Sequence, residues 1–294
     1  MDDVGTLRTF NRFYTQRIGV LSDSYLGTGR PLGPSRLLFE VGADGATVVD
    51  LRRRLELDSG YVSRMLRQLE QEALITVAPD PTDGRQRVVR LTAAGRREWR
   101  RLERRSQRVA ERLVDPLSDR QRAELAAALA TAERLLRAAT VTFDVADPGS
   151  PPARAALASY FAELDARFPT GFDPGDAGGD GRDEDALRPP TGTFLIASND
   201  GAPIGCGGVQ RVDDRTGEVK RMWIDAGWRG LGLGGRLLAE LEATARDLGY
   251  RRVVLDTNST LVEAVAMYEG AGYRPIERYN DNPYAQRWFA KPLR

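Results

Sequence analysis

The sequence predicts two domains: a mainly α-helical one over residues 1–138, and an α/β one over residues 139–294 with a mixed, largely antiparallel sheet. Three observations support this division. A length of 294 residues is typical of about two domains. The spacing of apolar residues changes from helical to alternating after Ala138. The charge also changes there, from 25 Lys and Arg against 19 Asp and Glu (+6) to 18 against 23 (−5).

Composition excludes several kinds of chemistry. No window approaches the ~18 uninterrupted apolar residues of a membrane span, and the acidic start lacks the order of a signal peptide, so we expect a cytoplasmic protein. The single cysteine, Cys206, excludes an internal disulfide. The absence of histidine excludes His-based triads and the usual Cys/His zinc sites, and we expect no metal. Any acid or base therefore comes from Asp, Glu, Tyr, Lys, Cys or water.

Helical periodicity dominates the first predicted domain. Prolines and a glycine within residues 31–34 separate its first two helices. Thr47 opens the third helix and Asp58 or Ser59 the fourth, because their side-chain oxygens accept hydrogen bonds from first-turn amides. The four predicted helices span residues 4–25, 35–41, 47–55 and 59–73. The last two are only a few residues apart, which is typical of a helix-turn-helix.

A β-hairpin and two further helices follow this tandem. Short alternating segments flank a polar run in which Asp83-Gly84 is the turn signal. Thr92 caps an Arg-rich helix, and Ser118 caps an Ala/Leu-rich one. The two strands and the two helices span residues 74–77, 87–91, 92–114 and 118–138. A helix-turn-helix followed by a hairpin predicts a winged helix.

The hairpin sequence carries a family resemblance. The run Asp83-Gly84-Arg85, followed six residues later by Leu91-Thr92, resembles the winged-helix signature of MarR-type transcriptional regulators. The resemblance covers residues 1–138 and implies binding to double-stranded DNA as a homodimer. The first and last helices suit dimerisation, which two half-sites in DNA require.

DNA reading falls to the second helix of the tandem and to the wing. Major-groove reading needs donors on one exposed helix face, and wing arginines suit the minor groove or its phosphates. The candidate DNA-binding residues are Thr47, Ser59, Tyr61, Ser63, Arg64, Arg67, Arg85 and Arg87. A solvated helix face is the alternative for Arg64 and Arg67. The arginines within residues 96–108 alternate with glutamates, so we expect a solvated, ion-paired face there.

The second predicted domain alternates between strands and helices. Its predicted strands span residues 141–145, 193–198, 204–212, 218–224, 252–257, 273–278 and 285–291. Its predicted helices span residues 151–164, 232–248 and 261–271. The stretch 169–192 is rich in Gly, Asp and Pro and predicts a mobile loop.

A glycine-rich run, RGLGLGGR from Arg229 to Arg236, lies between a strand and a long helix. Glycines let backbone amides approach a bound group, and the helix N-terminus adds positive potential, so the run suits a pyrophosphate. It matches the spacing of dinucleotide sites only loosely and lacks the ending of a P-loop. By itself it is also compatible with a turn that binds no ligand.

Two longer patterns resolve this ambiguity. Residues 218–224 (EVKRMWI), followed after four residues by residues 229–234, resemble the fourth strand and acyl-CoA pyrophosphate loop of GNAT acyltransferases. Residues 264–273 (AVAMYEGAGY) resemble that family's second cofactor motif with its tyrosine. The resemblance covers residues 139–294 and implies acetyl-CoA as co-substrate. Many relatives have Asn where this chain has Leu261, with Asn258 nearby.

The resemblance also implies which residues bind acetyl-CoA. Glycine amides and the Arg229 side chain would meet the pyrophosphate, and backbone groups of Met222 and Ile224 would hold pantetheine and the thioester carbonyl between the fourth and fifth strands. The expected set is Met222, Trp223, Ile224, Arg229, Gly230, Leu231, Gly232, Leu233, Gly234, Gly235 and Asn258. A neutral amine attacks the thioester directly, so no protein nucleophile is needed.

Two proton-handling roles remain. The resemblance implies that Tyr268 protonates the leaving CoA thiolate; a packed helix tyrosine is the alternative. Glu218 is the candidate base, because carboxylates are the first choice without histidine. An exposed strand glutamate or an ion pair with Arg221 is equally compatible with this position. Cys206 lies among glycines in a predicted core strand and is interpreted as a small buried hydrophobe.

Less regular segments are expected to select the acceptor. Residues 168–174 introduce the predicted loop, and residues 279–284 join the last two strands. The candidate substrate-binding residues are Phe172, Tyr279, Asn280, Asn282 and Tyr284. Plain surface turns are the alternative, since turn chemistry alone explains Asn, Asp and Pro.

These observations predict an acetyl-CoA-dependent N-acetyltransferase of a small amine or amino acid, fused to a MarR-like DNA-binding domain. The alternative is a transcriptional regulator whose GNAT-like part only senses acetyl-CoA or an amine, without turnover. A third hypothesis is a winged helix that has lost DNA binding and only dimerises an enzyme. The acidic second half favours a cationic acceptor only weakly.

Overall fold

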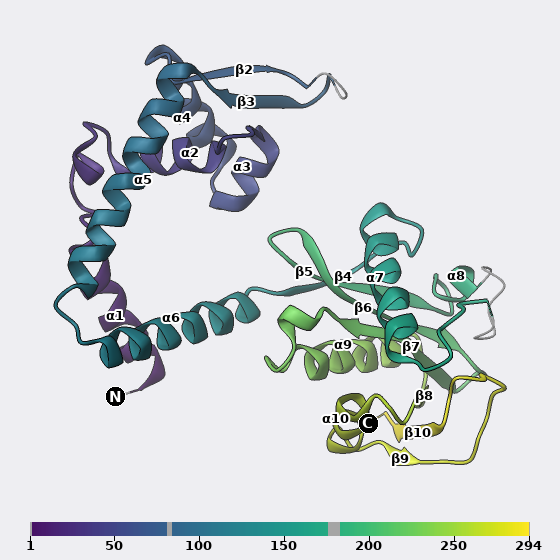
Figure 1. Cartoon of the computed structure of the whole chain (residues 1–294). Coiled ribbons are helices and arrows are strands. Elements are labelled where there is room, and N and C mark those ends of the chain that lie inside the picture. Colours follow the sequence, from purple (N-terminus) through teal and green to yellow (C-terminus); the bar gives the residue numbers. More distant parts are fainter. Residues whose placement is uncertain (1, 81–83, 176–182, 294) are drawn as a thin grey trace. The chain divides into compact units, whose positions relative to one another are not determined.

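The computed structural model describes residues 2–80, 84–175 and 183–293. The chain forms two compact units, Met1–Ala127 and Ala128–Arg294, and the division falls within helix α6 (Asp119–Ala139). The predicted fold class is confirmed: a mainly helical unit precedes one with a mixed sheet (Figure 1). Within the described residues, no helix has the length and apolar character that crossing a membrane requires.

The first unit is a helical core with a three-stranded antiparallel sheet. Its elements are α1 (Asp3–Arg17), η1 (Tyr25–Gly27), α2 (Leu32–Val41), β1 (Ala46–Thr47), α3 (Val48–Leu55), α4 (Ser59–Gln71), β2 (Ile75–Pro79), β3 (Arg87–Leu91), α5 (Ala93–Val114) and the first part of α6. The strand order is β1-β3-β2. The hairpin of β2 and β3 confirms the predicted strands, while Asp83 of the predicted turn lies outside the described residues.

The caps of this unit agree with the sequence at most helices. Thr47 Oγ1 accepts from Asp50 N at 3.0 Å, and Thr92 Oγ1 accepts from Gly95 N at 2.9 Å. Asp58, not Ser59, caps α4, since its Oδ1 accepts from Tyr61 N at 2.9 Å. Such caps supply partners for amides that have none inside the helix.

The prediction of one helix over residues 4–25 was wrong in its length. Helix α1 ends at Arg17, and Gly19 takes a φ of 71°, which a helix cannot continue through. Apolar spacing alone missed this end because the apolar residues of the helix and of the following loop fall at compatible intervals. None of the residues of α1 is buried.

Buried side chains from α2, α3, α4 and the hairpin form the core of the first unit. Helix α5 contributes the buried Leu102 to this core and makes polar and aromatic contacts with its surroundings. The Trp99 ring stacks on Phe39 at 5.8 Å, and its Nε1 donates to Phe39 O at 3.1 Å. The Arg30 guanidinium bridges Glu72 and Glu98 at 2.8 and 2.6 Å. The core therefore fixes α4, the predicted DNA-reading helix, against its neighbours.

The second unit is a seven-stranded sheet with helices on both faces. Its elements are the end of α6, β4 (Thr142–Val145), α7 (Pro151–Arg167), α8 (Asp183–Ala186), β5 (Thr193–Asn199), β6 (Ala202–Arg211), β7 (Thr216–Ile224), η2 (Ala226–Trp228), α9 (Leu233–Asp247), β8 (Arg252–Thr257), α10 (Val262–Gly270), β9 (Arg274–Pro275) and β10 (Arg287–Pro292). The strand order is β4-β5-β6-β7-β8-β10-β9. Among these described strands only β7 and β8 pair in parallel.

Alternation along β5 assigns the two faces of this sheet. Phe194 and Ile196 pack in the cluster of α7, while Leu195 and Ala197 pack in the cluster of α9. Because successive side chains of a strand point to opposite faces, α7 and α9 cover opposite sides (Figure 1). Cys206 is fully buried in the α7 cluster, which confirms its interpretation as a small hydrophobe, and burial raises the pKa of its thiol to about 12.

Two predictions for the second unit need correction. The predicted strand 273–278 is reduced to Arg274–Pro275, because its pairing with β10 ends at Pro275 and only Ile276 N still donates to Trp288 O, at 2.9 Å. Part of the predicted loop 169–192 is ordered: α8 forms a helical turn, and Leu187 is 1% exposed in the α7 cluster. Residues 176–182 of that loop lie outside the described residues.

Strands β7 and β8 pair only at their beginnings, from Thr216↔Arg252 to Glu218↔Val254. Beyond Glu218, β7 remains paired with β6 but not with β8. A bulge follows in β7, where three steps from Lys220 to Trp223 oppose two steps in β6, and Arg221 takes a φ of 54°. The divergence leaves an opening inside the sheet.

The close approach of Leu74, the residue before β2, to α5 gives a stability test. A Cβ on Gly95 would lie 1.9 Å from Leu74 O, a backbone atom that cannot move independently. We expect Gly95→Ala to destabilise the first unit by about 3 kcal/mol or more, because overpacking there forces the backbone apart. Denaturant unfolding followed by circular dichroism should show an early transition of this unit.

Gly60→Ala is the matched control, since its Cβ would meet only flexible side-chain atoms of Asp58 and Arg64. It should change stability by no more than about 1 kcal/mol. Equal effects of the two substitutions would contradict the packing argument.

Candidate functional site

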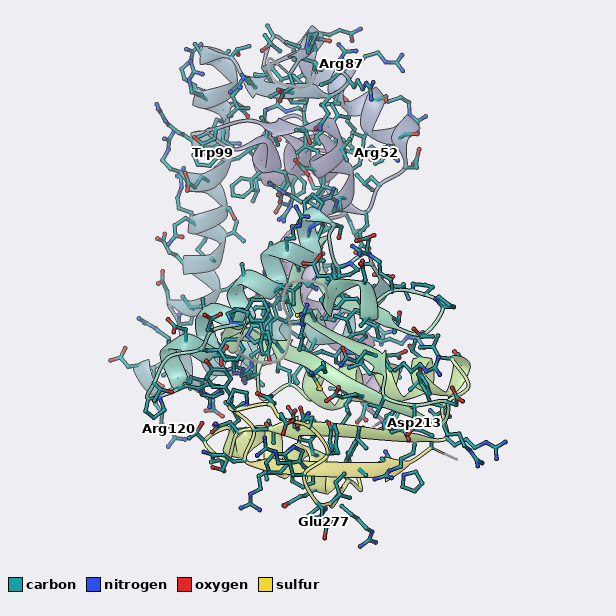
Figure 2. The ribbon with its side chains drawn as sticks, turned by 90° about the vertical axis from the view of Figure 1, so that its right-hand side faces the viewer. Arg52, Arg87, Trp99, Arg120, Asp213 and Glu277 are labelled. Atoms are coloured by element: carbon teal, nitrogen blue, oxygen red, sulfur yellow. The ribbon has the colours of Figure 1, made fainter. Side chains whose placement is uncertain are left out.

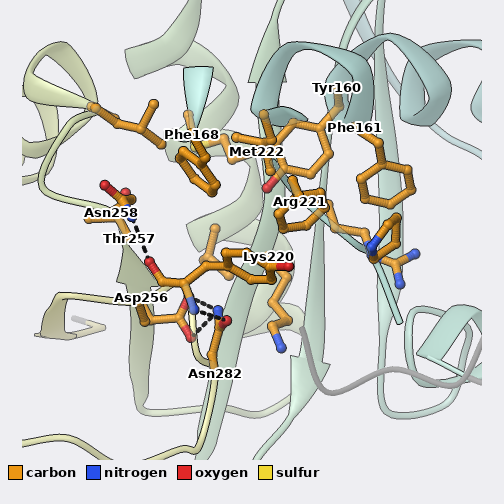
Figure 3. A pocket seen from close by; sticks show the side chains of 18 of the residues that line it. Tyr160, Phe161, Phe168, Lys220, Arg221, Met222, Asp256, Thr257, Asn258 and Asn282 are labelled. Carbon is orange, nitrogen blue, oxygen red and sulfur yellow. Dashed lines mark hydrogen bonds between the residues drawn. The ribbon is translucent and has the colours of Figure 1, made fainter. Parts of the chain in front are cut away.

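A cavity opens where β7 and β8 diverge (Figure 3). It encloses about 890 Å³, including its open mouth. The walls come from α7 and the segment after it, from the second half of β7, from the end of β8, from α10 and from the loop before β10. The lining residues are Tyr160, Phe161, Leu164, Phe168, Phe172, Pro174, Val219, Lys220, Arg221, Met222, Asp256, Thr257, Asn258, Leu261, Ala264, Tyr268, Asn282, Tyr284 and Ala285.

Tyr268 lines this cavity from α10. Its side chain is 7% exposed, and its Oη lies 3.9 Å from Met222 Sδ. Burial raises the pKa of this phenol, and the charge of Asp256 raises it further. The phenol is therefore protonated at neutral pH and can donate a proton to a group bound in the cavity.

The glycine-rich loop leads directly into α9. Gly230 and Gly232 have φ values of 76° and 75°, which favour glycine, and Gly232 is the N-cap of the helix. No side chain caps this helix start, so its first amides lack the usual protein partner. A Cβ at Gly230, Gly232 or Gly235 would meet nothing within 4 Å. These residues fit a pyrophosphate group, because open space and backbone donors coincide at a helix N-terminus.

Arg229 has partners on the protein side of this loop. Its Nε donates to Ile224 O at 2.9 Å, and its guanidinium is 2.5 Å from Glu163 Oε2. Glu163 also accepts from Trp223 Nε1 at 2.8 Å and pairs with Arg167 at 3.1 Å. Burial raises the pKa of Glu163, but the hydrogen bonds from Arg229 and Trp223 outweigh it and hold the pKa below its usual value. Glu163, which the sequence analysis missed, thus ties α7 to the loop.

Of the remaining residues expected to bind acetyl-CoA, Met222 and Asn258 line the cavity. Asn258 Oδ1 accepts from Thr260 N, and its Nδ2 donates to Tyr284 O at 2.8 Å. The side chains of Trp223, Ile224 and Leu233 are buried in the two cores, so only their backbone groups can meet a ligand.

Glu218 is the last residue of β7 that pairs with β8, and it does not line the cavity. Its side chain is 4% exposed and accepts from Gln210 Nε2 at 2.7 Å, Tyr279 Oη at 2.8 Å and Asn280 Nδ2 at 3.2 Å. Its ion pair is with Lys220, at 3.7 Å. Its role as a base stays a prediction, and any proton must reach it through these partners.

Asn280 connects Glu218 to a second carboxylate, that of Asp256. Its Oδ1 accepts from Trp288 Nε1 at 2.9 Å, and because this indole can only donate, the amide nitrogen faces the carboxylates. That nitrogen donates to both Glu218 and Asp256. Asn282 donates to Asp256 as well, at 3.2 Å (Figure 3). Sequence reasoning missed Asp256, whose position in a strand gives no local signal.

The expected substrate-binding residues separate into two groups. Phe172, Asn282 and Tyr284 line the cavity, whereas Tyr279 and Asn280 do not line it and donate hydrogen bonds to Glu218. The Phe172 and Tyr284 rings are 4.8 Å apart, and Asp173 N donates to Tyr284 Oη at 2.9 Å. The two segments predicted to select the acceptor therefore contact each other at the cavity.

The candidate DNA-binding residues of the first unit lie mainly on its surface. On α4, the side chains of Ser59, Tyr61, Ser63, Arg64 and Arg67 are exposed, while Val62, Met65, Leu66 and Leu69 face the core. Arg85 and Arg87 of the wing are exposed, and Arg87 lies at the outer surface (Figure 2). Thr47 is half-buried as the cap of α3.

The arginines of α5 were expected to form a solvated, ion-paired face, and this expectation holds only in part. Glu98 pairs with Arg101 at 3.5 Å. Arg105, however, donates to Leu26 O at 2.6 Å and so attaches α5 to η1.

Comparison with known proteins assigns both units to families. Residues 158–273 match the acetyltransferase (GNAT) family, and residues 28–86 match the MarR family. An IAA acetyltransferase of Azospirillum brasilense is 32% identical over 115 residues, which are 38% of this chain and 74% of the relative. The chain belongs to the GNAT acetyltransferase family. It also carries a MarR-family domain.

Two further similarities concern the GNAT part. An uncharacterized N-acetyltransferase of Schizosaccharomyces pombe is 37% identical over 97 residues, which are 32% of this chain and 60% of the relative. A GNAT-family acetyltransferase structure from Staphylococcus aureus covers 53% of this chain and 100% of that one, with 20% identity and a TM-score of 0.47.

The lowered pKa of Glu163 predicts a pH-dependent contribution to stability. A carboxyl group whose pKa is lower in the folded state stabilises the fold above its unfolded pKa of about 4.3, and this contribution is lost as the pH falls through the folded value. We expect Glu163→Gln to lower the stability of the GNAT unit at pH 7, with a deficit that shrinks below pH ~4. Thermal unfolding measured from pH 3 to 7 tests this.

Glu240→Gln, on the exposed side of α9, is the control and should show no such trend. A deficit for Glu163→Gln that is constant across the range would show that packing, not charge, links α7 to the loop.

Proposed function

We propose that the protein is an acetyl-CoA-dependent N-acetyltransferase of a small amine or amino acid, fused to a DNA-binding regulator domain. One observation carries the proposal: in a GNAT-family domain, the divergence of β7 and β8 opens a cavity that Tyr268 of α10 and Met222 of β7 line. GNAT proteins use acetyl-CoA, which supplies an acetyl group activated as a thioester.

Backbone groups hold the co-substrate in this proposal. The amides of Gly230, Gly232, Gly234 and Gly235 bind the pyrophosphate at the start of α9. Beyond Glu218, the edge of β7 that faces β8 has no strand partner among the described residues, so backbone groups of Met222 and the amide of Ile224 are assigned to pantetheine and to the thioester carbonyl. The carbonyl of Ile224 already accepts from Arg229 Nε at 2.9 Å. Polarising that carbonyl lowers the barrier, because negative charge accumulates on its oxygen during amine attack.

The proton-handling roles follow from position. Tyr268 protonates the leaving thiolate, which is supported by its place in the cavity and its protonated phenol. Glu218 accepts the amine proton only indirectly, since its side chain is buried and does not line the cavity. No covalent intermediate on the protein is needed, because the amine attacks the thioester itself.

The MarR-family domain supports the DNA-binding half of the proposal. The exposed donors of α4 bind bases and the wing arginines bind phosphates. Homodimerisation uses α1 and α6, which expose apolar side chains: Leu7, Phe10, Phe13, Leu125, Leu129 and Leu136 are all more than a third exposed.

A second candidate function is a sensor without turnover, and one contact favours it. In the first turn of α9, Arg236 donates to Ala138 O at 2.6 Å and to Val141 O at 3.1 Å, at the end of α6. A ligand at the glycine-rich loop would therefore bind next to the residues that hold the end of a helix shared by both units. Ligand-dependent DNA affinity without product would support this function.

Tyr268→Phe tests the enzymatic proposal. We expect kcat to fall about 100-fold with little change in the KM for acetyl-CoA, because the variant loses only the proton donor. Thiol release from acetyl-CoA against a panel of amino acids, polyamines, aminoglycosides and lysine peptides measures this. Tyr273→Phe is the matched control, because the Tyr273 ring is buried, its centre lies 5.8 Å from that of Tyr268, and it does not line the cavity.

Absence of thiol release with the whole panel, while acetyl-CoA binds, would overturn the enzymatic function in favour of the sensor. Unchanged kcat in Tyr268→Phe would remove the assigned role of the phenol. Glu218→Gln tests the base separately, and a wild-type rate for that variant would remove its role.

DNA binding is tested by replacing the α4 arginines. Arg64→Ala with Arg67→Ala should weaken binding to duplex DNA, selected from a random-sequence pool, by about tenfold or more. Arg100→Ala with Arg104→Ala removes the same charge from the exposed face of α5 and is the control. Equal losses in both double variants, measured by fluorescence anisotropy, would indicate binding by net charge alone.

A further inference from the structure

The charged side chains that line the cavity differ in their partners. Lys220 pairs with Glu218 at 3.7 Å, and the Arg221 guanidinium lies over the Phe161 ring, 5.8 Å from its centre. Asp256 accepts hydrogen bonds from the amides of Asn280 and Asn282 but makes no ion pair within the described part of the chain. A carboxylate with only neutral donors keeps its negative charge available to a cation in the cavity.

The amide donors also fix the direction of this carboxylate. The Trp288 indole donates to Asn280 Oδ1 and so orients the amide, whose Nδ2 then donates to the Asp256 carboxylate. Asp256 lies two residues beyond Val254, the last residue of β8 that pairs with β7, so it stands where the cavity begins. A cation bound there shares the opening with Tyr268 and Met222.

Aromatic rings form the opposite wall. The Phe161 and Phe172 rings stack at 5.8 Å, and the Phe168 and Tyr284 rings stack at 5.8 Å. Figure 3 shows Phe161 and Phe168 on the side of the cavity away from Asp256. Rings at these separations leave faces and edges that attract a further ring or a cation. A long aliphatic or strongly polar acceptor would use little of this wall.

We propose that the acceptor is an arylalkylamine, whose ammonium group binds Asp256 and whose ring packs among Phe161, Phe168, Phe172 and Tyr284. The inference rests on the proposed acetyltransferase function and adds the substrate class to it. Asp256 acts as the specificity-determining residue of the amine site.

The transfer balances without a further reactant. The ammonium group loses one proton, which Glu218 accepts indirectly and releases to solvent, and the resulting amine nitrogen forms a bond to the acetyl carbon. The carbon–sulfur bond breaks, and the sulfur leaves with its electron pair and takes a proton from Tyr268. The phenol is restored by the second proton of the attacking nitrogen, so the products are an N-acetyl arylalkylamine, CoA and one proton.

The test compares three amines on the full chain. 2-Phenylethylamine carries the ring and the cation, butylamine lacks the ring, and phenylalanine adds a carboxylate that would meet Asp256. Thiol release gives kcat/KM, and isothermal titration in the presence of CoA gives the affinity of each amine. We expect 2-phenylethylamine to exceed both others by about tenfold or more in both measurements.

Asp256→Asn should raise the KM and the Kd for 2-phenylethylamine about tenfold or more, while the KM for acetyl-CoA stays unchanged. Asp281→Asn, on the same loop as Asn280 and fully exposed, is the matched control and should change neither. Phe172→Leu keeps an apolar side chain but removes a ring, and should reduce the preference for 2-phenylethylamine over butylamine. It provides the test if Asp256→Asn fails to fold in a thermal melt.

The outcomes separate this inference from the proposed function. Faster transfer to butylamine or phenylalanine, or an unchanged Kd in Asp256→Asn, would overturn the arylalkylamine site while leaving an acetyltransferase. No transfer to any amine would overturn the enzyme; Asp256-dependent binding of 2-phenylethylamine would then still support the ligand class, and absence of that binding would overturn it too.

Discussion

The second unit depends on one constraint: two parallel strands that begin as neighbours cannot remain paired once β7 bulges. Pairing up to Glu218 and Val254 keeps the sheet continuous and its core closed. Loss of pairing beyond this point exposes backbone donors and acceptors that would be costly if they were buried without partners. The cavity, the free edge of β7 and the position of Asp256 all follow from this divergence, and a bound ligand is the natural partner for the exposed groups.

A network of polar side chains next to the cavity holds two carboxylates, those of Glu218 and Asp256, near each other. Asn280 donates to both Glu218 and Asp256, while Trp288 fixes its orientation and Lys220 balances one of the charges. The result assigns the two acids to different surroundings. Glu218 is enclosed by donors, whereas Asp256 faces the opening. The two carboxylates therefore differ because their burial and their hydrogen-bond partners differ, and not because one is Glu and the other Asp.

Local signals account for what the sequence predicted well. Caps such as Thr47 and Thr92 and the alternation of β5 act within a few residues, so the elements were accessible. Tyr268 and Met222 were expected from the resemblance to GNAT acyltransferases, and Tyr284 from the polar segment before the last strand. Glu163 and Asp256 were not, because their importance arises from partners that are 66 and 24 residues away in the chain. Leu187 was missed for the opposite reason, since a Gly- and Asp-rich neighbourhood hid a single core residue.

Glu163 has a consequence for the energetics of binding. Glu163 lies on α7, close in the chain to Phe161 and Phe168 of the cavity wall. It also pairs with Arg229 of the glycine-rich loop. A pyrophosphate that attracts the Arg229 guanidinium would remove one of the donors of Glu163 and loosen α7 at its contact with the loop. The affinities for co-substrate and acceptor are then thermodynamically linked, and by reciprocity each substrate changes the binding of the other by the same factor. A single carboxylate between the two binding regions is sufficient for each substrate to change the affinity of the other.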